Sequence, residues 1–243
     1  MDQIEVMNEG PFLRRSVSLK SIALKGVDDH IMKINQILLE EVLRIKVNIL
    51  QRRNRGPLKS ILVTSANHGE GTSTLAIHLA FAFAVGGSAR VLLVDANIRR
   101  PSLHTRFGLE RENGFVELIN GKIDLGASIK QLPSSNIKVM TAGQTIDDTP
   151  IAAFHAISQE AKHFIERDFD WVLYDAAPVN GYPDTLMETK LADGVILVIQ
   201  AEKTRLVAVR TAKESLESVE ANILGGALNG RKYFIPEFIY RRL

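Results

Sequence analysis

The stretch that decides the fold is "SANHGEGTSTLAIHLA", which runs from Ser65 to Ala80. It follows the short β-rich run "KSILVTS" and leads into a segment whose composition favours a buried helix. A strand, a glycine-rich turn and a helix in this order form a cradle for phosphate, because the turn and the helix N-terminus aim backbone amides at the ligand. The usual loop carries a lysine before its final hydroxyl residue, whereas here Thr72 precedes Ser73.

Further apolar runs follow the loop, and segments with helical periodicity separate most of them. The runs are "RVLLVDA", "IKVMTAG", "DWVLYDAA", "GVILVIQA" and "ANILGGALNG", and the predicted helices cover residues 73–85, 150–167 and 204–219. Near-continuous apolar strands that alternate with helices indicate a mostly parallel central sheet with helices on both faces. The sequence therefore predicts an α/β fold of the P-loop NTPase type, whose ligands bind outside the carboxyl ends of the strands.

The chain divides into three parts. Residues 1–30 have no clear period and are expected to be irregular. Residues 31–231 are expected to form the NTPase-like domain, which begins with a helix over 31–53 because apolar residues recur there at three- and four-residue steps. Residues 232–243, "KYFIPEFIYRRL", alternate aromatic and apolar residues around a proline and are interpreted as a docking segment.

Composition narrows the class of protein. A chain of 243 residues with 45% hydrophobic and 24% charged residues is typical of one large soluble α/β domain. The net charge of +2 is too small to predict a nucleic-acid partner, and the absence of cysteine fits a cytoplasmic protein. No apolar run reaches the ~18–20 residues that a membrane helix needs, so any membrane association is expected to be peripheral.

Two aspartates stand where apolar runs end: Asp95 in "VLLVDANIRRP" and Asp175 in "WVLYDAAP". Because the carboxyl ends of parallel strands meet at one edge of a sheet, both can converge on the glycine loop. Carboxylates and a serine hydroxyl are hard oxygen ligands suited to Mg²⁺, which makes Ser73, Asp95 and Asp175 the candidate metal ligands. The predicted ligand is ATP or ADP, and the candidate nucleotide-binding residues of the loop are Gly69, Glu70, Gly71, Thr72, Ser73 and Thr74.

These motifs resemble those of the bacterial tyrosine autokinases of capsule and exopolysaccharide assembly, relatives of the deviant Walker ATPases that include partition proteins. The family motifs Pro-Gly-Glu-Gly-Lys-Ser-Thr, Asp-x-Asp-x-Arg-Arg-Pro and Asp-x-Pro-Pro read here "HGEGTST", "DANIRRP" and "DAAP". The resemblance covers roughly residues 38–231. It implies that Ser73 and Asp175 organise Mg²⁺, that Asp95 activates the attacking hydroxyl or water, and that Asn229 lies near the adenine.

The chain departs from the family motifs at four positions. Thr72 replaces the loop lysine, His68 the preceding proline, Asn97 the second aspartate, and Ala177 the first proline of the last motif. Lys59 is a poor replacement for the missing lysine, because it precedes the first strand of the domain and would lie at the opposite end from the loop.

Two further family features are weak here. The oligomerising helix of the family resembles Glu-x-x-Arg-x-x-Arg, and Glu40, Leu43 and Lys46 occupy these positions, which predicts a monomer or small oligomer. The family's C-terminal tyrosine cluster is reduced to Tyr233 and Tyr240. The resemblance also implies a partner, an inner-membrane chain-length-determining protein (a polysaccharide co-polymerase), and hence a cytoplasmic protein peripheral to the inner membrane.

Three functions remain open at this stage. Backbone amides still bind phosphate without the lysine, but losing one preorganised donor typically lowers the rate of catalysis about 10²–10³-fold. We therefore favour a nucleotide-binding regulator of exopolysaccharide polymerisation or export with weak or no kinase activity. The alternative is an active Mg-ATP-dependent protein-tyrosine autokinase. A partition-type positioning ATPase is the weaker alternative, because its extra loop lysine is absent from residues 65–67.

Overall fold

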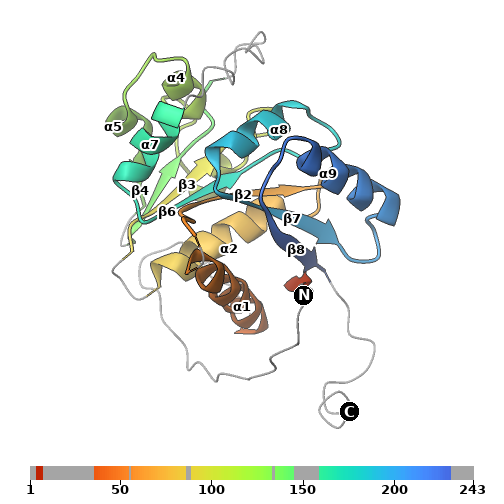
Figure 1. Cartoon of the computed structure of the whole chain (residues 1–243). Coiled ribbons are helices and arrows are strands. Elements are labelled where there is room, and N and C mark those ends of the chain that lie inside the picture. Colours follow the sequence, from red (N-terminus) through yellow and green to blue (C-terminus); the bar gives the residue numbers. More distant parts are fainter. Residues whose placement is uncertain are drawn as a thin grey trace.

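The computed structural model describes residues 4–7, 36–54, 56–85, 89–132, 135–144 and 159–230. Within these residues one sheet of eight strands has the order β1-β8-β7-β2-β6-β3-β5-β4 (Figure 1). The six central strands are parallel: β8 (Ile223–Asn229), β7 (Gly194–Gln200), β2 (Ser60–Ser65), β6 (Trp171–Asp175), β3 (Val91–Asp95) and β5 (Ile137–Met140). Two short edge strands, β1 (Ile4–Met7) and β4 (Lys130–Gln131), pair antiparallel. The predicted mostly parallel α/β fold is confirmed.

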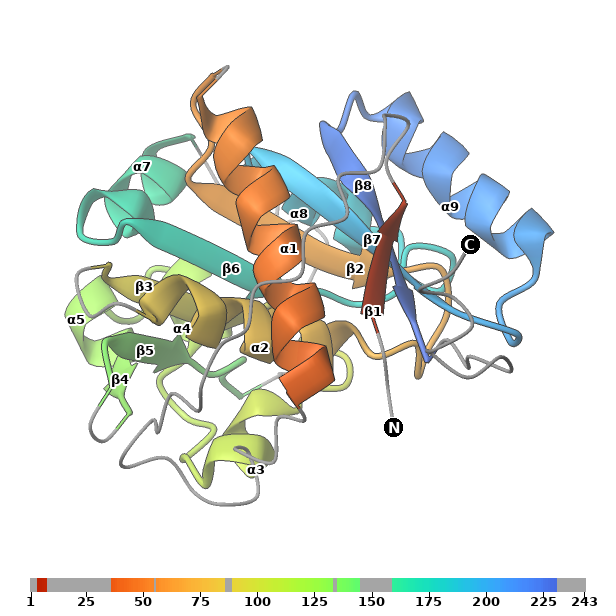
Figure 2. The ribbon, with the colours of Figure 1, turned by 90° about the horizontal axis from the view of Figure 1, so that it is seen from below.

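Helices cover both faces of this sheet. The longer ones are α1 (Gln36–Arg53), α2 (Thr72–Ala84), α7 (Gln159–Arg167) and α9 (Leu206–Ser218). The shorter ones are α3 (Leu103–Phe107), α4 (Phe115–Ile119), α5 (Leu125–Ser128), α8 (Asp184–Glu188) and the 3₁₀ turn η1 (Thr189–Leu191). Helices α1 and α2 lie on one face, which Figure 2 shows from below, and α4, α5, α7, α8 and α9 lie on the other (Figure 1).

The alternation of side chains along β2 explains why the centre of this strand, residues 61–63, is apolar. Ile61 and Val63 belong to the core layer that contains α1 and α2, whereas Leu62 belongs to the layer on the opposite face. A strand that is buried on both faces has no polar side, which is the physical reason for the continuous run. Helix α2 begins directly at the glycine loop and is buried along most of its length, so the loop is attached to a rigid element.

Within the segment 1–30, which is predicted to be mostly irregular, Ile4–Met7 form β1 and pair with β8. Four residues that gain order only by pairing with a distant strand leave no periodic signal in the sequence. The docking segment 232–243, with Tyr233 and Tyr240, lies outside the described residues, as do the predicted helical residues 31–35 and 150–158. The predicted helices end within about two residues of the ends of α1, α2, α7 and α9, and those predicted to begin at residues 73 and 204 begin within about two residues of α2 and α9.

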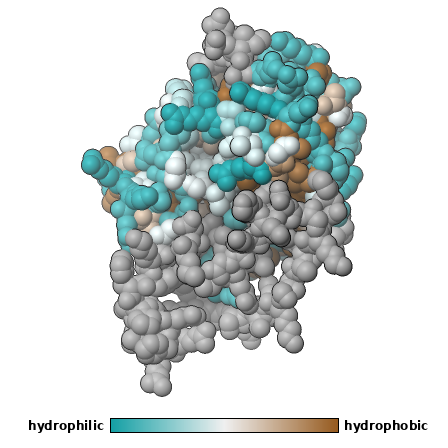
Figure 3. All heavy atoms as spheres, turned by 180° about the vertical axis from the view of Figure 1, so that it is seen from behind, coloured by the Kyte–Doolittle hydropathy of each residue, from teal (hydrophilic) through white to brown (hydrophobic). Residues whose placement is uncertain are grey.

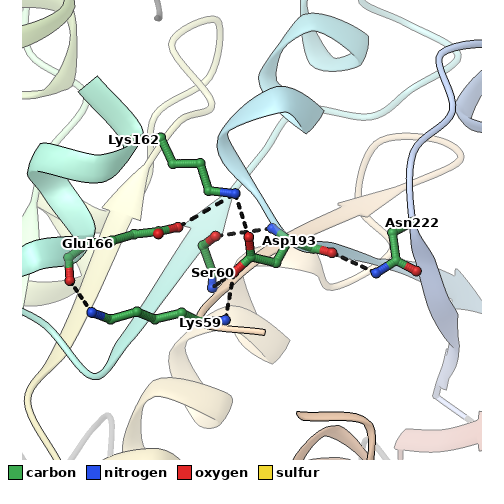
Figure 4. A network of polar contacts seen from close by, with 6 residues as sticks. All are labelled: Lys59, Ser60, Lys162, Glu166, Asp193 and Asn222. Carbon is green, nitrogen blue, oxygen red and sulfur yellow. Dashed lines mark hydrogen bonds and ion pairs between the residues drawn. The ribbon is translucent and has the colours of Figure 1, made fainter. Parts of the chain in front are cut away.

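A network of polar contacts lies at the amino ends of the parallel strands (Figure 4). The carboxylate of Asp193 accepts hydrogen bonds from the backbone amides of Lys59 (2.6 Å) and Ser60 (3.0 Å). The same carboxylate pairs with the ammonium of Lys162 at 2.5 Å. The ammonium of Lys59 donates to the backbone carbonyl of Glu166. Lys59 is therefore held at the edge opposite the glycine loop, as expected, and it does not replace the missing loop lysine.

No helix among the described residues is long and apolar enough to cross a membrane. The face seen from behind in Figure 3 is mostly hydrophilic where it is coloured, with hydrophobic residues in small groups.

Candidate nucleotide site

The glycine loop connects β2 to α2 at the carboxyl ends of the parallel strands. Gly69 (φ 78°) and Gly71 (φ 96°) both adopt left-handed backbone conformations, which glycine reaches without steric cost. A Cβ atom on Gly71 would lie 2.1 Å from the side-chain nitrogen of Asn229, because β8 approaches the loop closely at this point. The first amides of α2 have no partner within the helix and remain available for an anion.

Glu70 and Asn229 hold the loop in this shape. The carboxylate of Glu70 is buried and accepts hydrogen bonds from the Ala66 amide (3.0 Å), the Asn67 side chain (3.1 Å) and the Thr204 hydroxyl (2.7 Å). The side-chain amide of Asn229 donates to the Glu70 carbonyl at 2.9 Å. Both residues were candidates for nucleotide binding, and in this structure both side chains bind the loop itself.

The hydroxyl of Ser73 meets the loop that follows β3. Residues 72–74 form the first turn of α2 and are partly exposed. The Ser102 hydroxyl donates to the Ser73 hydroxyl at 3.2 Å. The backbone amides of Ser102 and Leu103 both donate to the same carboxylate oxygen of Asp95, Oδ2, each at 2.9 Å. Ser73 and Asp95 are thus joined through Ser102, a residue that sequence reasoning did not single out.

Asp95 and Asp175 are direct neighbours in the sheet, because they pair in the register of β3 and β6. Both are buried, and neither carboxylate oxygen of Asp175 nor the second oxygen of Asp95 has a hydrogen-bond partner among the described residues. Burial raises the pKa of Asp175 to about 8, and the charge of Asp95 adds to this rise. Ser73 lowers the pKa of Asp175 without reaching hydrogen-bond geometry. Burial raises the pKa of Asp95 to about 6, against the opposing effect of the backbone amides.

Unpartnered buried carboxylates are costly, and a divalent cation would compensate for them. Among the described residues no group of three or more His, Asp or Glu side chains is arranged to hold a metal ion. Two carboxylates and a hydroxyl nevertheless fit Mg²⁺, which keeps several waters and takes further ligands from phosphates. Ser73, Asp95 and Asp175 are brought together as predicted, and they are the residues that could hold Mg²⁺.

A second acidic pair lies behind this site on α8. The guanidinium of Arg99 pairs with the Asp184 carboxylate at 2.6 Å. Glu188 is buried, and one of its oxygens has no hydrogen-bond partner among the described residues. Burial, followed by the charges of Asp184 and Asp175, raises its pKa well above the usual range. Sequence reasoning missed Glu188, because a glutamate inside a short helix has no motif that marks it as buried.

Three substituted positions have local roles in this structure. Asn97 accepts a hydrogen bond from the Arg100 amide at 3.1 Å and so stabilises its own turn. His68 contacts the hydroxyl of Tyr182 at 3.2 Å, and partial burial and the charge of Arg100 lower its pKa. The carbonyl of Ala177 accepts the hydroxyl of Thr64 at 2.6 Å. None of these contacts places a cation within the glycine loop.

Comparison with known proteins identifies similar chains. The profile of the ParA family, described as NUBPL iron-transfer P-loop NTPase, matches residues 58–238. The chain is 31% identical over 193 residues to the tyrosine-protein kinase YwqD of Bacillus subtilis (strain 168), covering 79% of this chain and 81% of the relative. It is 29% identical over 174 residues to the tyrosine-protein kinase CpsD of Streptococcus pneumoniae, covering 71% and 76%.

Solved structures agree with this result. The chimerical protein CapA2B2 superposes with a TM-score of 0.74 at 27% identity, over 82% of this chain and 87% of that chain. The kinase domain of the Escherichia coli tyrosine kinase ETK superposes with a TM-score of 0.75 at 21% identity, over 96% and 92%, and this similarity shows the fold.

Proposed function

The chain belongs to the bacterial tyrosine autokinase family of ParA/MinD-type P-loop ATPases, and from this premise we propose that it is a nucleotide-binding regulator of capsule or exopolysaccharide assembly. In this proposal it binds ATP or ADP with Mg²⁺ and has little or no kinase activity of its own. One observation carries the proposal: the glycine loop lies beside two buried aspartates, three of whose four carboxylate oxygens have no hydrogen-bond partner among the described residues, while Thr72 stands where the family has its cation.

Each part of the site has a role in this proposal. The amides of residues 69–73 would bind the phosphates, and Ser73 and Asp175 would hold a metal ion that offsets the phosphate charge. Asp95, whose pKa burial raises to about 6, would accept the proton of an attacking hydroxyl or water. Because Thr72 offers no positive charge to the transferred phosphoryl group, we expect binding to persist and turnover to be low.

The second candidate is an active autokinase, and the intact surroundings of Asp95 favour it. Ser102 and Leu103 still orient this carboxylate, so its role as a proton acceptor does not depend on the missing lysine. A partition-type positioning ATPase is less well supported. That class carries an extra lysine within residues 65–67. Here the neutral side chain of Asn67 donates a hydrogen bond to Glu70.

The partner we propose is a chain-length-determining protein of the inner membrane, with this chain on its cytoplasmic side. The family resemblance and the similarity to the chimerical protein CapA2B2 support this proposal. We also propose that the protein is a monomer or small oligomer. In α1, Leu43 stands where the family motif has its middle arginine, and the ammonium of Lys46 is bonded to the Ala82 carbonyl at 2.6 Å.

Calorimetric titration with ATP, with and without Mg²⁺, tests the site. We expect Mg²⁺ to tighten ATP binding to the parent and to the control variant Asp168→Asn, an exposed position, but not to Asp175→Asn. Equal affinity for the parent with and without Mg²⁺ would reject the metal assignment, and the absence of ATP binding would reject the proposed function.

Mass spectrometry after incubation with Mg-ATP tests the activity. We expect no substantial phosphate on Tyr233 or Tyr240. Substantial modification that disappears in an Asp95→Ala variant would replace the regulator proposal with the autokinase alternative.

A further inference from the structure

The turn between β7 and α9, residues 201–205, packs against the glycine loop. This turn contains Lys203. The hydroxyl of Thr204 donates to the Glu70 carboxylate at 2.7 Å and accepts the Gln200 backbone amide at 3.0 Å. The side-chain amide of Gln200 lies between the loop and the turn. In the orientation that satisfies both its atoms, it donates to the Gly69 carbonyl and accepts from the Lys203 ammonium, each at 3.3 Å.

The backbone of this turn is held firmly. Glu202 adopts a left-handed conformation (φ 62°), which costs a residue other than glycine about 1–2 kcal/mol and persists only where the surroundings impose it. The Ala201 amide donates to the Asn229 carbonyl at 2.8 Å, and the Thr204 amide donates to the Gln200 carbonyl at 3.0 Å. The stem of Lys203 therefore starts from a fixed point beside the loop.

The charge of Lys203 has no counterion in the part of the chain that the structure describes. Its side chain is exposed, and no described carboxylate forms an ion pair with it. Two other cations are held elsewhere. Arg99 is already paired with Asp184 at 2.6 Å, and Lys59 lies at the opposite edge of the sheet.

We propose that Lys203 supplies, from the β7–α9 turn, the cation that Thr72 does not supply, and that its ammonium contacts the phosphate chain of the bound nucleotide. This inference rests on the proposed function, because it requires a phosphate ligand in the glycine loop. Phosphates bound to the loop amides lie next to Gly69, and the Gln200 amide already holds the Lys203 ammonium on that side. A flexible four-carbon stem lets the ammonium turn from Gln200 to a more strongly charged partner.

The test compares ATP, ADP and AMP affinities of the parent with those of Lys203→Met, Lys203→Arg and the control Lys190→Met, an exposed lysine on η1. A hydrogen bond to a charged group contributes roughly 10-fold or more to affinity. We expect Lys203→Met to weaken ATP binding about 10-fold and AMP binding less. The loss of ATP affinity should be smaller at high salt, because exposed charges are screened. Lys203→Arg should keep most of the affinity, and Lys190→Met should match the parent.

A rescue experiment separates the charge from a structural role. Adding Thr72→Lys to Lys203→Met should restore ATP affinity, since a loop lysine supplies the same charge from another position. If Lys203 only stabilised the turn, this addition would not restore it, and circular dichroism melting would show a loss of stability. If the parent binds ATP and Lys203→Met binds it equally well, this inference is wrong while the proposed function stands. If the parent does not bind ATP, both are wrong.

Discussion

Replacing Asp175 with asparagine is expected to stabilise the empty protein, although it removes a residue proposed to hold the metal ion. Asp175 is 1% exposed, and neither oxygen of its carboxylate has a hydrogen-bond partner among the described residues. Burial raises its pKa from an ordinary value of 3.8 to about 8. At neutral pH the folded protein must therefore keep a proton on this carboxyl that the unfolded chain would release.

The magnitude follows from proton linkage. Because the pKa is raised on folding, the folded state binds the extra proton between about pH 4 and pH 8, so stability is highest at low pH and falls as the pH rises. One proton corresponds to a slope of about 1.4 kcal/mol per pH unit. Asparagine takes up no proton, so the stability advantage of Asp175→Asn over the parent should grow by about 2–3 kcal/mol between roughly pH 5 and pH 7.

Chemical denaturation at several pH values, without nucleotide and with a chelator, measures this difference. Asp168→Asn is the control, because Asp168 is exposed and, among the described residues, its ion pair is with its neighbour Arg167 at 3.3 Å. Adding Mg-ATP should reverse the order, since a ligand that binds only the folded state stabilises the parent more than Asp175→Asn. The reasoning would be refuted if the variant were less stable than the parent at pH 7, or if the two had the same pH dependence.

Other substitutions probe the loop and the opposite edge of the sheet. Thr72→Lys should tighten ATP binding by about 10- to 150-fold and AMP binding less, and unchanged ATP affinity in a folded variant would contradict a phosphate role for the loop. Gly71→Ala should destabilise the protein by about 1–3 kcal/mol and weaken ATP binding. The φ of 96° at this position disfavours alanine, and the added Cβ would clash with the Asn229 side chain. An unchanged melting temperature would count against this prediction. At Asp193, burial alone would raise the pKa, but the bonds from Lys162 and two amides outweigh it and leave the pKa lowered. The stabilisation by the ionised Asp193 carboxylate is present above the pKa of this group in the unfolded chain, and it is lost as the pH falls through its pKa in the folded protein. Asp193→Asn should therefore lower the free energy of unfolding by about 1–3 kcal/mol at pH 7 and by less in acid. Denaturation curves that differ equally at both pH values would contradict it.

The sequence by itself determined the class of fold and the edge of the sheet at which the site lies. Strands that are buried on both faces have no polar side, so the centre of β2 and most of β3 and β6 stand out as apolar runs. A residue that ends a parallel strand lies at the carboxyl edge whatever the strand order, and this places Asp95 and Asp175 beside the glycine loop. These properties are local, because they depend on residues next to one another in the chain.

Only the tertiary structure decided which groups touch. The place of β6 between β2 and β3 makes Asp95 and Asp175 direct neighbours, and the strand order leaves no trace in the spacing of the motifs. The hydrogen bond of Glu70 with Thr204 and the contact of Gln200 with Gly69 join segments more than a hundred residues apart. Such contacts depend on hydrogen bonds and packing between distant strands, which a local pattern of apolar residues does not encode.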